Sequence, residues 1–200
     1  MARSGTRRTR AQVRPVRIET ERLILRLPEV DDAGEIAAYY RENRDHLQPW
    51  SPRWPPDVLS EEFWREQVPQ RQAELADGTA VTLFLFEKRA PTRVVGNLSL
   101  TQIVRGAAQR CTIGYGLAAR AQGQGFMVEA VRAAVAYAFD DLRLHRVSAS
   151  YLPRNRRSAH VLQRAGFQIE GYAKDYLRID GRWEDHIIAA ITNPAWHGRG

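Results

Sequence analysis

The chain has 200 residues, of which 44% are hydrophobic and 26% are charged, and its formal net charge is +7. These values predict a soluble globular domain and exclude a fibrous or wholly disordered protein. No apolar run approaches the ~20 residues of a transmembrane helix, and no apolar segment typical of a secretory signal follows the first methionine. We therefore expect a cytoplasmic protein with no membrane partner, and its single cysteine, Cys111, excludes an internal disulfide.

The two ends of the chain differ from its middle. Residues 1–17 contain six arginines and no acidic residue, so we expect a mobile basic tail there. One domain should follow over residues 18–194, and a second short tail over residues 195–200. The basic tail either contacts a ribosome or RNA, or is only a solubilising extension, so direct nucleic-acid binding is left open. The sequence does not decide between a monomer and a homodimer.

The first half of the chain predicts a strand, two helices and a meander. Alternating apolar residues indicate a strand over residues 21–27, which Pro28 ends. Asp31 or Asp32 could cap a helix over residues 33–43, and Ser60 could cap another to about residue 76. Three antiparallel strands joined by short turns should follow, over residues 80–87, 94–103 and 110–117.

Residues 46–56, between the two predicted helices, contain four prolines and two tryptophans. The prolines exclude a regular helix and predict a stiff loop. Trp50 and Trp54 either form the wall of a substrate groove or cover the edge of the core.

The second half predicts a turn rich in glycine, two further helices and three strands. The Asp180-Gly181 pair indicates a hairpin between the last two strands. The element order is β-α-α-β-β-β-α-β-α-β-β, which predicts an α+β domain built on a mixed (α/β) sheet, with strands 110–117 and 146–151 parallel. The expected elements are helices over residues 127–140 and 156–165, and strands over residues 146–151, 167–179 and 183–191.

The glycine turn, Arg120 to Met127, joins a predicted strand to the start of a helix. Such a turn presents several backbone N–H groups to a phosphate or pyrophosphate, and glycine lets the ligand come close. The third glycine of a dinucleotide fingerprint and the Gly-Lys-Ser/Thr end of a P-loop are both missing. What remains is the pattern Arg/Gln-x-x-Gly-x-Gly/Ala, formed by Arg120, Gly123 and Gly125.

About thirty residues further on, the segment from Asn155 to Phe167 resembles the second acetyl-CoA motif of the GCN5-related N-acetyltransferases (GNAT). Short segments between Ile113 and His186 also resemble the Rim-type ribosomal-protein alanine N-acetyltransferases (RimJ/RimL-like). The resemblance covers about residues 18–194 and is more specific in the C-terminal half. It implies the GNAT fold and direct transfer of an acetyl group from acetyl-CoA to a primary amine in a ternary complex.

The implied acceptor is the N-terminal α-amine of a protein, with a ribosomal protein or the ribosome as partner. Two alternatives stay open: an acetyltransferase of a small amine (an antibiotic, a polyamine or an amino acid), and a CoA-binding ribosome- or RNA-associated factor with little catalysis. An α-amine is about 14% neutral at pH 7 and a lysine only about 0.04%. Because the sequence shows no dedicated base, these values favour the α-amine.

The resemblance also implies individual roles. Ser158 would be the general acid toward the CoA sulfur, although it could be an ordinary early-helix serine. The backbone N–H of Leu117 would contact the thioester oxygen where the strand splays from its parallel neighbour, and Tyr115 is the tyrosine nearest to this splay. Asn155 is a helix N-cap and would also contact the pantetheine arm. The cofactor-binding set is Leu117, Gln122, Gly123, Gln124, Gly125, Phe126, Met127 and Asn155.

Several further residues keep two interpretations. Gly114 and Gly116 indicate either a close ligand approach or tight packing. The arginines of the last helix either contact the 3′-phosphate of CoA or face solvent (Arg156, Arg157 and Arg164). Nothing separates the four carboxylates that could be the general base (Glu87, Asp175, Glu184 and Asp185). Cys111 is expected to be a buried strand thiol, and the five histidines show no ligand spacing, so no metal is expected.

Overall fold

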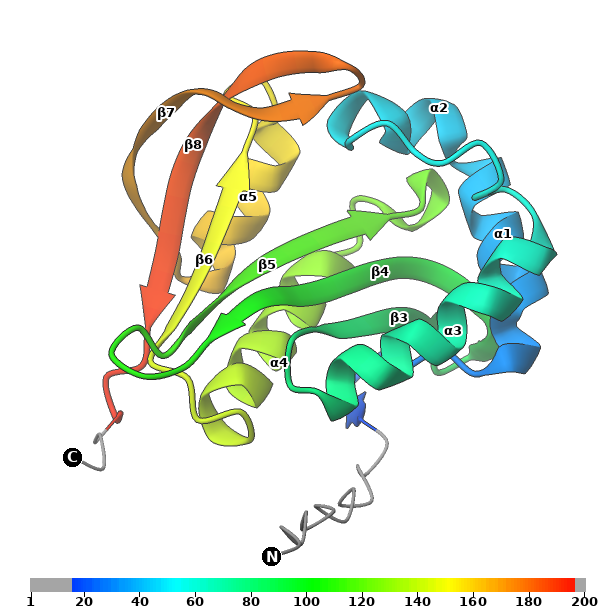
Figure 1. The fold of residues 1–200 in the computed structure, drawn as a ribbon, viewed down its shortest axis with the longest axis horizontal. Helices are drawn as coiled ribbons and strands as arrows, with labels where there is room; N and C mark the ends of the chain where they lie inside the picture. Colours follow the sequence, from blue (N-terminus) through cyan, green and yellow to red (C-terminus); the bar gives the residue numbers. More distant parts are fainter. Residues whose placement is uncertain (1–15, 197–200) are drawn as a thin grey trace, which may run out of the picture.

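The computed structural model describes residues 16–196 (Figure 1). Eight strands form one sheet in the order β1-β2-β3-β4-β5-β6-β8-β7. Every neighbouring pair is antiparallel except β5 and β6, which are parallel as predicted. The strands are β1 (Arg17–Glu19), β2 (Leu23–Arg26), β3 (Val81–Glu87), β4 (Ala90–Val104), β5 (Arg110–Leu117), β6 (Arg146–Tyr151), β7 (Gln168–Ile179) and β8 (Arg182–Thr192).

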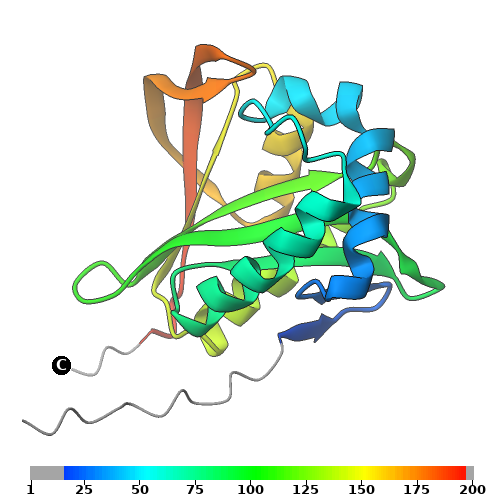
Figure 2. The ribbon, with the colours of Figure 1, turned by 45° about the vertical axis from the view of Figure 1, so that its right-hand side comes forward.

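Helices cover both faces of this sheet (Figures 1 and 2). The α-helices are α1 (Ala33–Glu42), α2 (Arg44–Leu47), α3 (Glu61–Ala76), α4 (Phe126–Asp140) and α5 (Arg156–Ala165). Three short 3-10 helices complete the chain: η1 (Val30–Asp32), η2 (Gln48–Trp50) and η3 (Ala119–Ala121). Helices α1 and α3 pack on one face, α4 packs on the other, and α5 lies beside α4 and β6. This is the predicted mixed-sheet α+β architecture.

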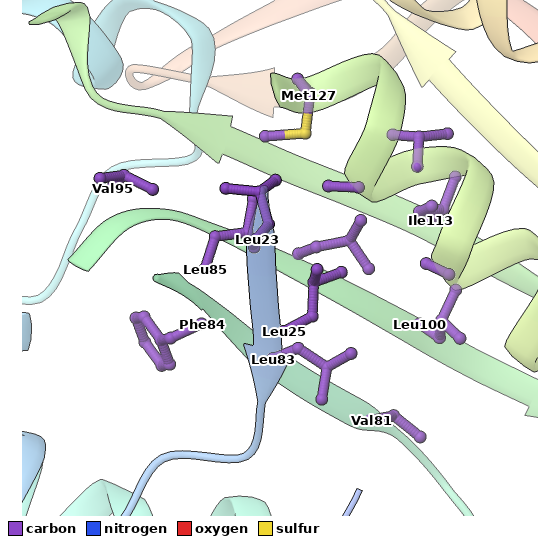
Figure 3. Packing of buried hydrophobic residues seen from close by; sticks show 14 of the residues in the cluster. Leu23, Leu25, Val81, Leu83, Phe84, Leu85, Val95, Leu100, Ile113 and Met127 are labelled. Atoms are coloured by element: carbon purple, nitrogen blue, oxygen red, sulfur yellow. The ribbon is translucent and has the colours of Figure 1, made fainter. Parts of the chain in front are cut away.

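The core lies between the sheet and the helices on both sides. Strand β3 is buried on both faces, so it is almost continuously apolar and does not alternate. Leu83 and Leu85 pack with the leucines of β2 and with Met127 of α4 (Figure 3), while Phe84 meets Trp64 of α3 edge-on, with ring centroids 5.7 Å apart. Two apolar layers therefore fix the position of the central strands.

All the predicted helices and strands are present, and the differences lie at their edges. Strand β1 was missed because Arg17 was assigned to the tail, yet Val16 is buried and Arg17 begins the strand. Residues 1–15 and 197–200, which make up most of the predicted tails, lie outside the described residues. The prediction that residues 46–56 contain no regular helix was wrong at His46 and Leu47, which end the short α2. Pro49 is accommodated in the first turn of η2, where a missing N–H costs little.

The two predicted helix caps behave differently. The Ser60 hydroxyl accepts a hydrogen bond from the Phe63 N–H at 3.2 Å, so it caps α3 as predicted. Asp32 precedes α1, but its carboxylate does not cap that helix. It accepts a hydrogen bond from the Glu29 N–H and forms an ion pair with Arg26 at 2.6 Å. Asp32 therefore joins α1 to β2.

The β7–β8 hairpin reaches across the end of the sheet toward α2 (Figure 1). Its turn is the predicted Asp180-Gly181 pair, and both residues have positive φ. The Asp180 N–H donates a hydrogen bond to the Ser51 carbonyl at 3.0 Å, which connects the hairpin to the loop after η2. Within residues 16–196 no helix is long and apolar enough to cross a membrane.

Strands β4 and β5 approach so closely at Gly96 that a side chain cannot fit. A Cβ at this position would lie 2.7 Å from the carbonyl oxygen of Gly116. We predict that Gly96→Ala lowers the free energy of unfolding by about 1–3 kcal/mol, because the backbone of β5 must shift. Urea unfolding measures this change.

Gly171→Ala is the matched control for this prediction. A Cβ there meets nothing within 4 Å among the described residues, and the position has no positive φ. Equal destabilisation by both substitutions would contradict the packing explanation.

Candidate active site

A cleft opens where the two parallel strands separate. Strands β5 and β6 pair only from Arg110 to Thr112, opposite Arg146 to Ser148. Beyond this point β5 stays paired with β4 and β6 stays paired with β8, so the two strands diverge. The separation therefore begins earlier than the predicted site near Gly116 and Leu117. The resulting cleft has a volume of about 1530 Å³.

One edge of β5 faces this cleft without a strand partner. The Ala118 N–H donates a hydrogen bond to the Val95 carbonyl of β4 at 2.8 Å. Along a strand of an antiparallel pair, residues whose N–H and C=O groups point to the partner alternate with residues whose groups point away. The groups of Ile113, Tyr115 and Leu117 therefore point away from β4. The Thr112–Ser148 pair still uses the Ile113 N–H, so the groups available to an extended ligand are the Ile113 carbonyl and the N–H and C=O groups of Tyr115 and Leu117.

The glycine turn forms one end of the cleft. All six residues from Gln122 to Met127 line it, and α4 begins at Phe126. Gly123 and Gly125 have φ values of +76° and +79°, a conformation that side chains of L-residues disfavour. These glycines are thus required by the backbone itself, in addition to the close approach expected from the sequence.

The N-terminal strands hold this turn from outside. The Arg22 guanidinium donates to the Gln124 carbonyl at 2.8 Å and to the Glu129 carboxylate at 2.8 Å, and lies over the Phe126 ring. The Thr20 hydroxyl donates to the same carboxylate at 2.5 Å. Partial burial opposes ionisation of Glu129, but these hydrogen bonds outweigh it and hold its pKa below the ordinary value.

The end of α1 holds the turn from the other side. Asn43 is buried; its Oδ1 accepts a hydrogen bond from the Ala119 N–H at 2.9 Å, and its Nδ2 donates to the Tyr39 carbonyl at 2.8 Å. The side chains of His46 and Gln122 share a hydrogen bond of 2.9 Å. Sequence reasoning missed Asn43 and His46, because each lies 76 residues from its partner and belongs to no local motif.

Tyr115 and Ser158 meet in the cleft. The Tyr115 hydroxyl lies 2.8 Å from Ser158 Oγ, although the two residues are 43 positions apart. Burial raises the pKa of Tyr115 to about 12, against the opposing effect of the Ser158 hydrogen bond. Tyr115 therefore keeps its proton at neutral pH and can donate it.

Asn155 caps the helix that carries Ser158. Its Oδ1 accepts a hydrogen bond from the Ser158 N–H at 3.0 Å, which confirms the N-cap role. This places the Ser158 hydroxyl in the first turn of α5, where the helix favours developing negative charge. All the predicted catalytic and cofactor-binding residues line this one cleft.

The face of the sheet that carries α1 and α3 forms the opposite wall. Gly116 belongs to this face, because a Cβ there would point at Asn97, Tyr39 and Leu47. Trp50 and Trp54 both line the cleft, and Trp54 also packs edge-on against Tyr40. Trp54 thus both forms part of the cleft wall and covers the edge of the core, as the two interpretations from the sequence proposed.

Arg154 joins this wall to the C-terminal hairpin. Its guanidinium forms two hydrogen bonds with the Glu184 carboxylate, at 2.8 and 3.0 Å, and lies 5.7 Å from the Trp50 ring centroid. Together with the hydrogen bond between Asp180 and Ser51, this contact encloses the cleft on the α2 side.

None of the four carboxylates considered as a general base is among the described residues that line the cleft. Glu87 is buried and forms an ion pair with Arg89. Glu184 is bound by Arg154, and Asp185 accepts hydrogen bonds from the Tyr172 hydroxyl and the Asp175 N–H. These contacts give the carboxylates of Glu87, Glu184 and Asp185 structural roles, whereas Asp175 takes part only through its backbone N–H.

Two further expectations concern charge and sulfur. Arg156, Arg157 and Arg164 all line the cleft beside the glycine turn. Cys111 is buried in β5, and this burial raises its pKa to about 12, so it is not an activated nucleophile. Within residues 16–196 no group of three or more His, Cys, Asp or Glu side chains could hold a metal ion.

Comparisons with known proteins agree with this geometry. A family model described as an acetyltransferase (GNAT) domain matches residues 22–168. The chain is 38% identical over 187 residues to the [ribosomal protein uS5]-alanine N-acetyltransferase of Escherichia coli K12, covering 94% of this chain and 96% of that protein.

Solved structures that exceed 25% sequence identity have the same fold, and two of them illustrate the match. The ribosomal-protein-S5-alanine acetyltransferase of Vibrio fischeri has a TM-score of 0.86 and 36% identity, over 92% of this chain and 100% of that one. RimJ of Mycobacterium smegmatis, in complex with CoA-disulfide, has a TM-score of 0.80 and 29% identity, over 89% and 85% of the two chains. The chain therefore belongs to the GNAT acetyltransferase family, within its Rim-type branch.

Proposed function

We propose that this N-acetyltransferase moves the acetyl group of acetyl-CoA to the N-terminal α-amine of a ribosomal protein, in the cytoplasm. The observation that carries the proposal is the unpaired edge of β5 beside the glycine turn, with Tyr115 and Ser158 in the same cleft. The acceptor rests on the uS5-alanine N-acetyltransferase that is 38% identical over nearly the whole chain. The acetyltransferase domain spans residues 18–194, and Val16 just before it also packs into the core.

The cofactor binds along two features that meet at Leu117. The N–H groups from Gln122 to Met127 hold the pyrophosphate at the start of α4. The pantetheine arm pairs with the free edge of β5, as an added strand would. Asn155 caps α5 and orients it toward this arm. Arg156, Arg157 and Arg164 supply positive charge toward the 3′-phosphate.

Acetyl transfer then needs a donor at the oxyanion and a proton at the sulfur. The Leu117 N–H points into the cleft and stabilises the thioester oxygen as it gains charge. The amine nitrogen bonds to the carbonyl carbon while the C–S bond breaks. Ser158 gives its hydroxyl proton to the departing thiolate and regains one from Tyr115, which is protonated because its pKa is about 12.

The enclosed acceptor side favours a chain end over a folded surface. The contacts of Asp180 with Ser51 and of Arg154 with Glu184 bound the cleft on this side, which favours an acceptor that enters as an extended segment. The alternative of an RNA-associated factor has less support. Of 30 basic residues, six lie in residues 1–15 and 197–200, which leaves 24 against 23 acidic residues over residues 16–196.

We predict that Gly125→Ala weakens CoA binding by about tenfold, or roughly 1.4 kcal/mol, because alanine disfavours the φ of +79° that aims the N–H groups. Calorimetric titration with CoA measures the dissociation constant. Gly78→Ala is the control, since Gly78 has a similar φ of +67° in a turn outside the cleft. If both variants bind CoA like the wild type, the turn does not hold the pyrophosphate.

We predict that Ser158→Ala lowers kcat by about 10²-fold or more and leaves CoA affinity nearly unchanged, because only the proton transfer to sulfur is lost. Tyr115→Phe should lower kcat less, and the double variant should be no slower than Ser158→Ala, since the two hydroxyls act in series. Tyr137→Phe, outside the cleft, is the control for these steady-state rates. Additive losses would place Tyr115 and Ser158 in independent roles.

The acceptor is tested by offering acetyl-CoA with a peptide that copies the alanine-starting N-terminus of ribosomal protein uS5. We expect acetylation at the α-amine and none at an internal lysine, because the α-amine is ~400-fold more often neutral at pH 7. Mass spectrometry of the product locates the acetyl group. A panel of polyamines, amino acids and aminoglycosides runs in parallel, and turnover of only these small amines would overturn the proposal.

A further inference from the structure

One buried polar side chain on the acceptor side is used by nothing described so far. His186 of β8 is only 3% exposed and lines the cleft. Its Nδ1 lies 2.9 Å from the carbonyl oxygen of Glu184. A carbonyl can only accept a hydrogen bond, so Nδ1 must carry the proton. In the neutral ring, Nε2 therefore has a free lone pair.

Nothing within residues 16–196 occupies this lone pair. The only hydrogen bond of the His186 ring in that part of the chain is the one to Glu184. Yet no fully buried side-chain nitrogen or oxygen of the described residues lacks a partner. Nε2 must therefore be reachable from outside the protein, and the cleft that His186 lines provides this access.

Strand register places His186 at the open end of the sheet, where the cleft lies. Thr112 pairs with Ser148, and Ser148 pairs with Ala190, so these three residues form one row across the sheet. Four residues further toward the open end lie Gly116 on β5 and His186 on β8, where β5 and β6 have already diverged. Gly116 directly precedes Leu117, whose N–H faces the cleft.

The same register places His186 on the acceptor face. Residues four apart on a strand project from the same side, and partners in a row share that side. Gly116 belongs to the face that carries α1 and α3, and so does His186. Tyr115 projects from the opposite face, where it meets Ser158 of α5. His186 and the Tyr115–Ser158 pair thus lie on opposite faces of the sheet at the cleft.

We propose that His186 is the general base, which takes the proton from the acceptor amine at Nε2. This inference rests on the proposed acetyl transfer. His186 takes one proton from the protonated amine, and the neutral nitrogen then bonds to the thioester carbon while the C–S bond breaks and the thiolate takes a proton from Ser158. The products are the N-acetyl amine and CoA thiol. Solvent takes the second proton of the amine nitrogen and the proton on His186, and it restores the proton lost by the Tyr115–Ser158 pair.

The two carboxylates next to His186 in the sequence, Glu184 and Asp185, already have hydrogen-bond partners. The Tyr176 ring lies 5.6 Å from the imidazole, and the Glu184 carboxylate is held by Arg154. Asp185 accepts hydrogen bonds from Tyr172 and Asp175. Imidazole is also the side chain that ordinarily exchanges protons at neutral pH.

His186→Asn tests the proposal. Its amide can keep the hydrogen bond to the Glu184 carbonyl but lacks Nε2. We expect kcat/KM for an alanine-starting peptide to fall by about 10²-fold or more, with CoA affinity unchanged. The same peptide beginning with trifluoroalanine, whose amine is already neutral at pH 7, should lose far less. His145→Asn, which alters a histidine packed on Trp196 outside the cleft, is the control.

The outcomes separate the two proposals. If the wild type acetylates neither peptide, the proposed function fails, and this inference with it. If the wild type is active and His186→Asn is equally impaired with both peptides, or unimpaired with both, only the general base is wrong. Nitrogen-15 NMR of the wild type gives a check that needs no variant. We expect the ring proton on Nδ1, and a proton on Nε2 in the neutral ring would overturn the proposal.

Discussion

The short pairing between β5 and β6 is the constraint on which the site depends. Only three residues of each strand are in register before each strand follows its own antiparallel neighbour. Backbone N–H and C=O groups are strong hydrogen-bonding groups that need partners. A strand edge left open inside a cleft therefore favours a ligand that can pair with it, and a linear amide chain such as pantetheine does so.

Contacts elsewhere in the fold hold the segments around this open edge in place. Thr20 and Arg22, which lie between β1 and β2, bind Glu129 in the first turn of α4 and the Gln124 carbonyl of the glycine turn, while Asn43 holds the segment before it. The hairpin of β7 and β8 touches the loop after η2 at Ser51. Contacts from both ends of the chain thus converge on one cleft. This explains why the cofactor side and the acceptor side have a fixed relative position.

Chemistry is divided between the two faces of the sheet. Tyr115 and Ser158 lie on the face that carries α4 and α5, where the thiolate would leave. The acceptor face is open over Gly116 and is walled by Trp50 and Trp54. In the proposed reaction, protons would therefore enter and leave by separate routes, and the amine and the thiolate would not compete for one group.

Elements with local signals could be predicted from the sequence. Strand β5 and helix α5 have the predicted bounds. Glycine and asparagine residues mark the ends of such elements, and the spacing of apolar residues marks their buried faces. The glycine turn and Ser158 were found through a motif. Contacts between residues 43 to 76 positions apart in the sequence could not be predicted, because they depend on how distant elements pack in three dimensions. Examples are Tyr115 with Ser158 and Asn43 with Ala119. The four carboxylates were chosen by residue type alone, and three of them (Glu87, Glu184 and Asp185) have partners that give them structural roles.

The measurement that tests this account most directly is a crystal structure with a non-hydrolysable acetyl-CoA analogue. We expect the pantetheine amides to pair with the backbone of Ile113 and Tyr115, and the acetyl oxygen to lie about 3 Å from the Leu117 nitrogen. The pyrophosphate should contact the N–H groups of Gln122 to Met127. A cofactor bound elsewhere, with the edge of β5 left free or covered by a protein strand, would contradict the account.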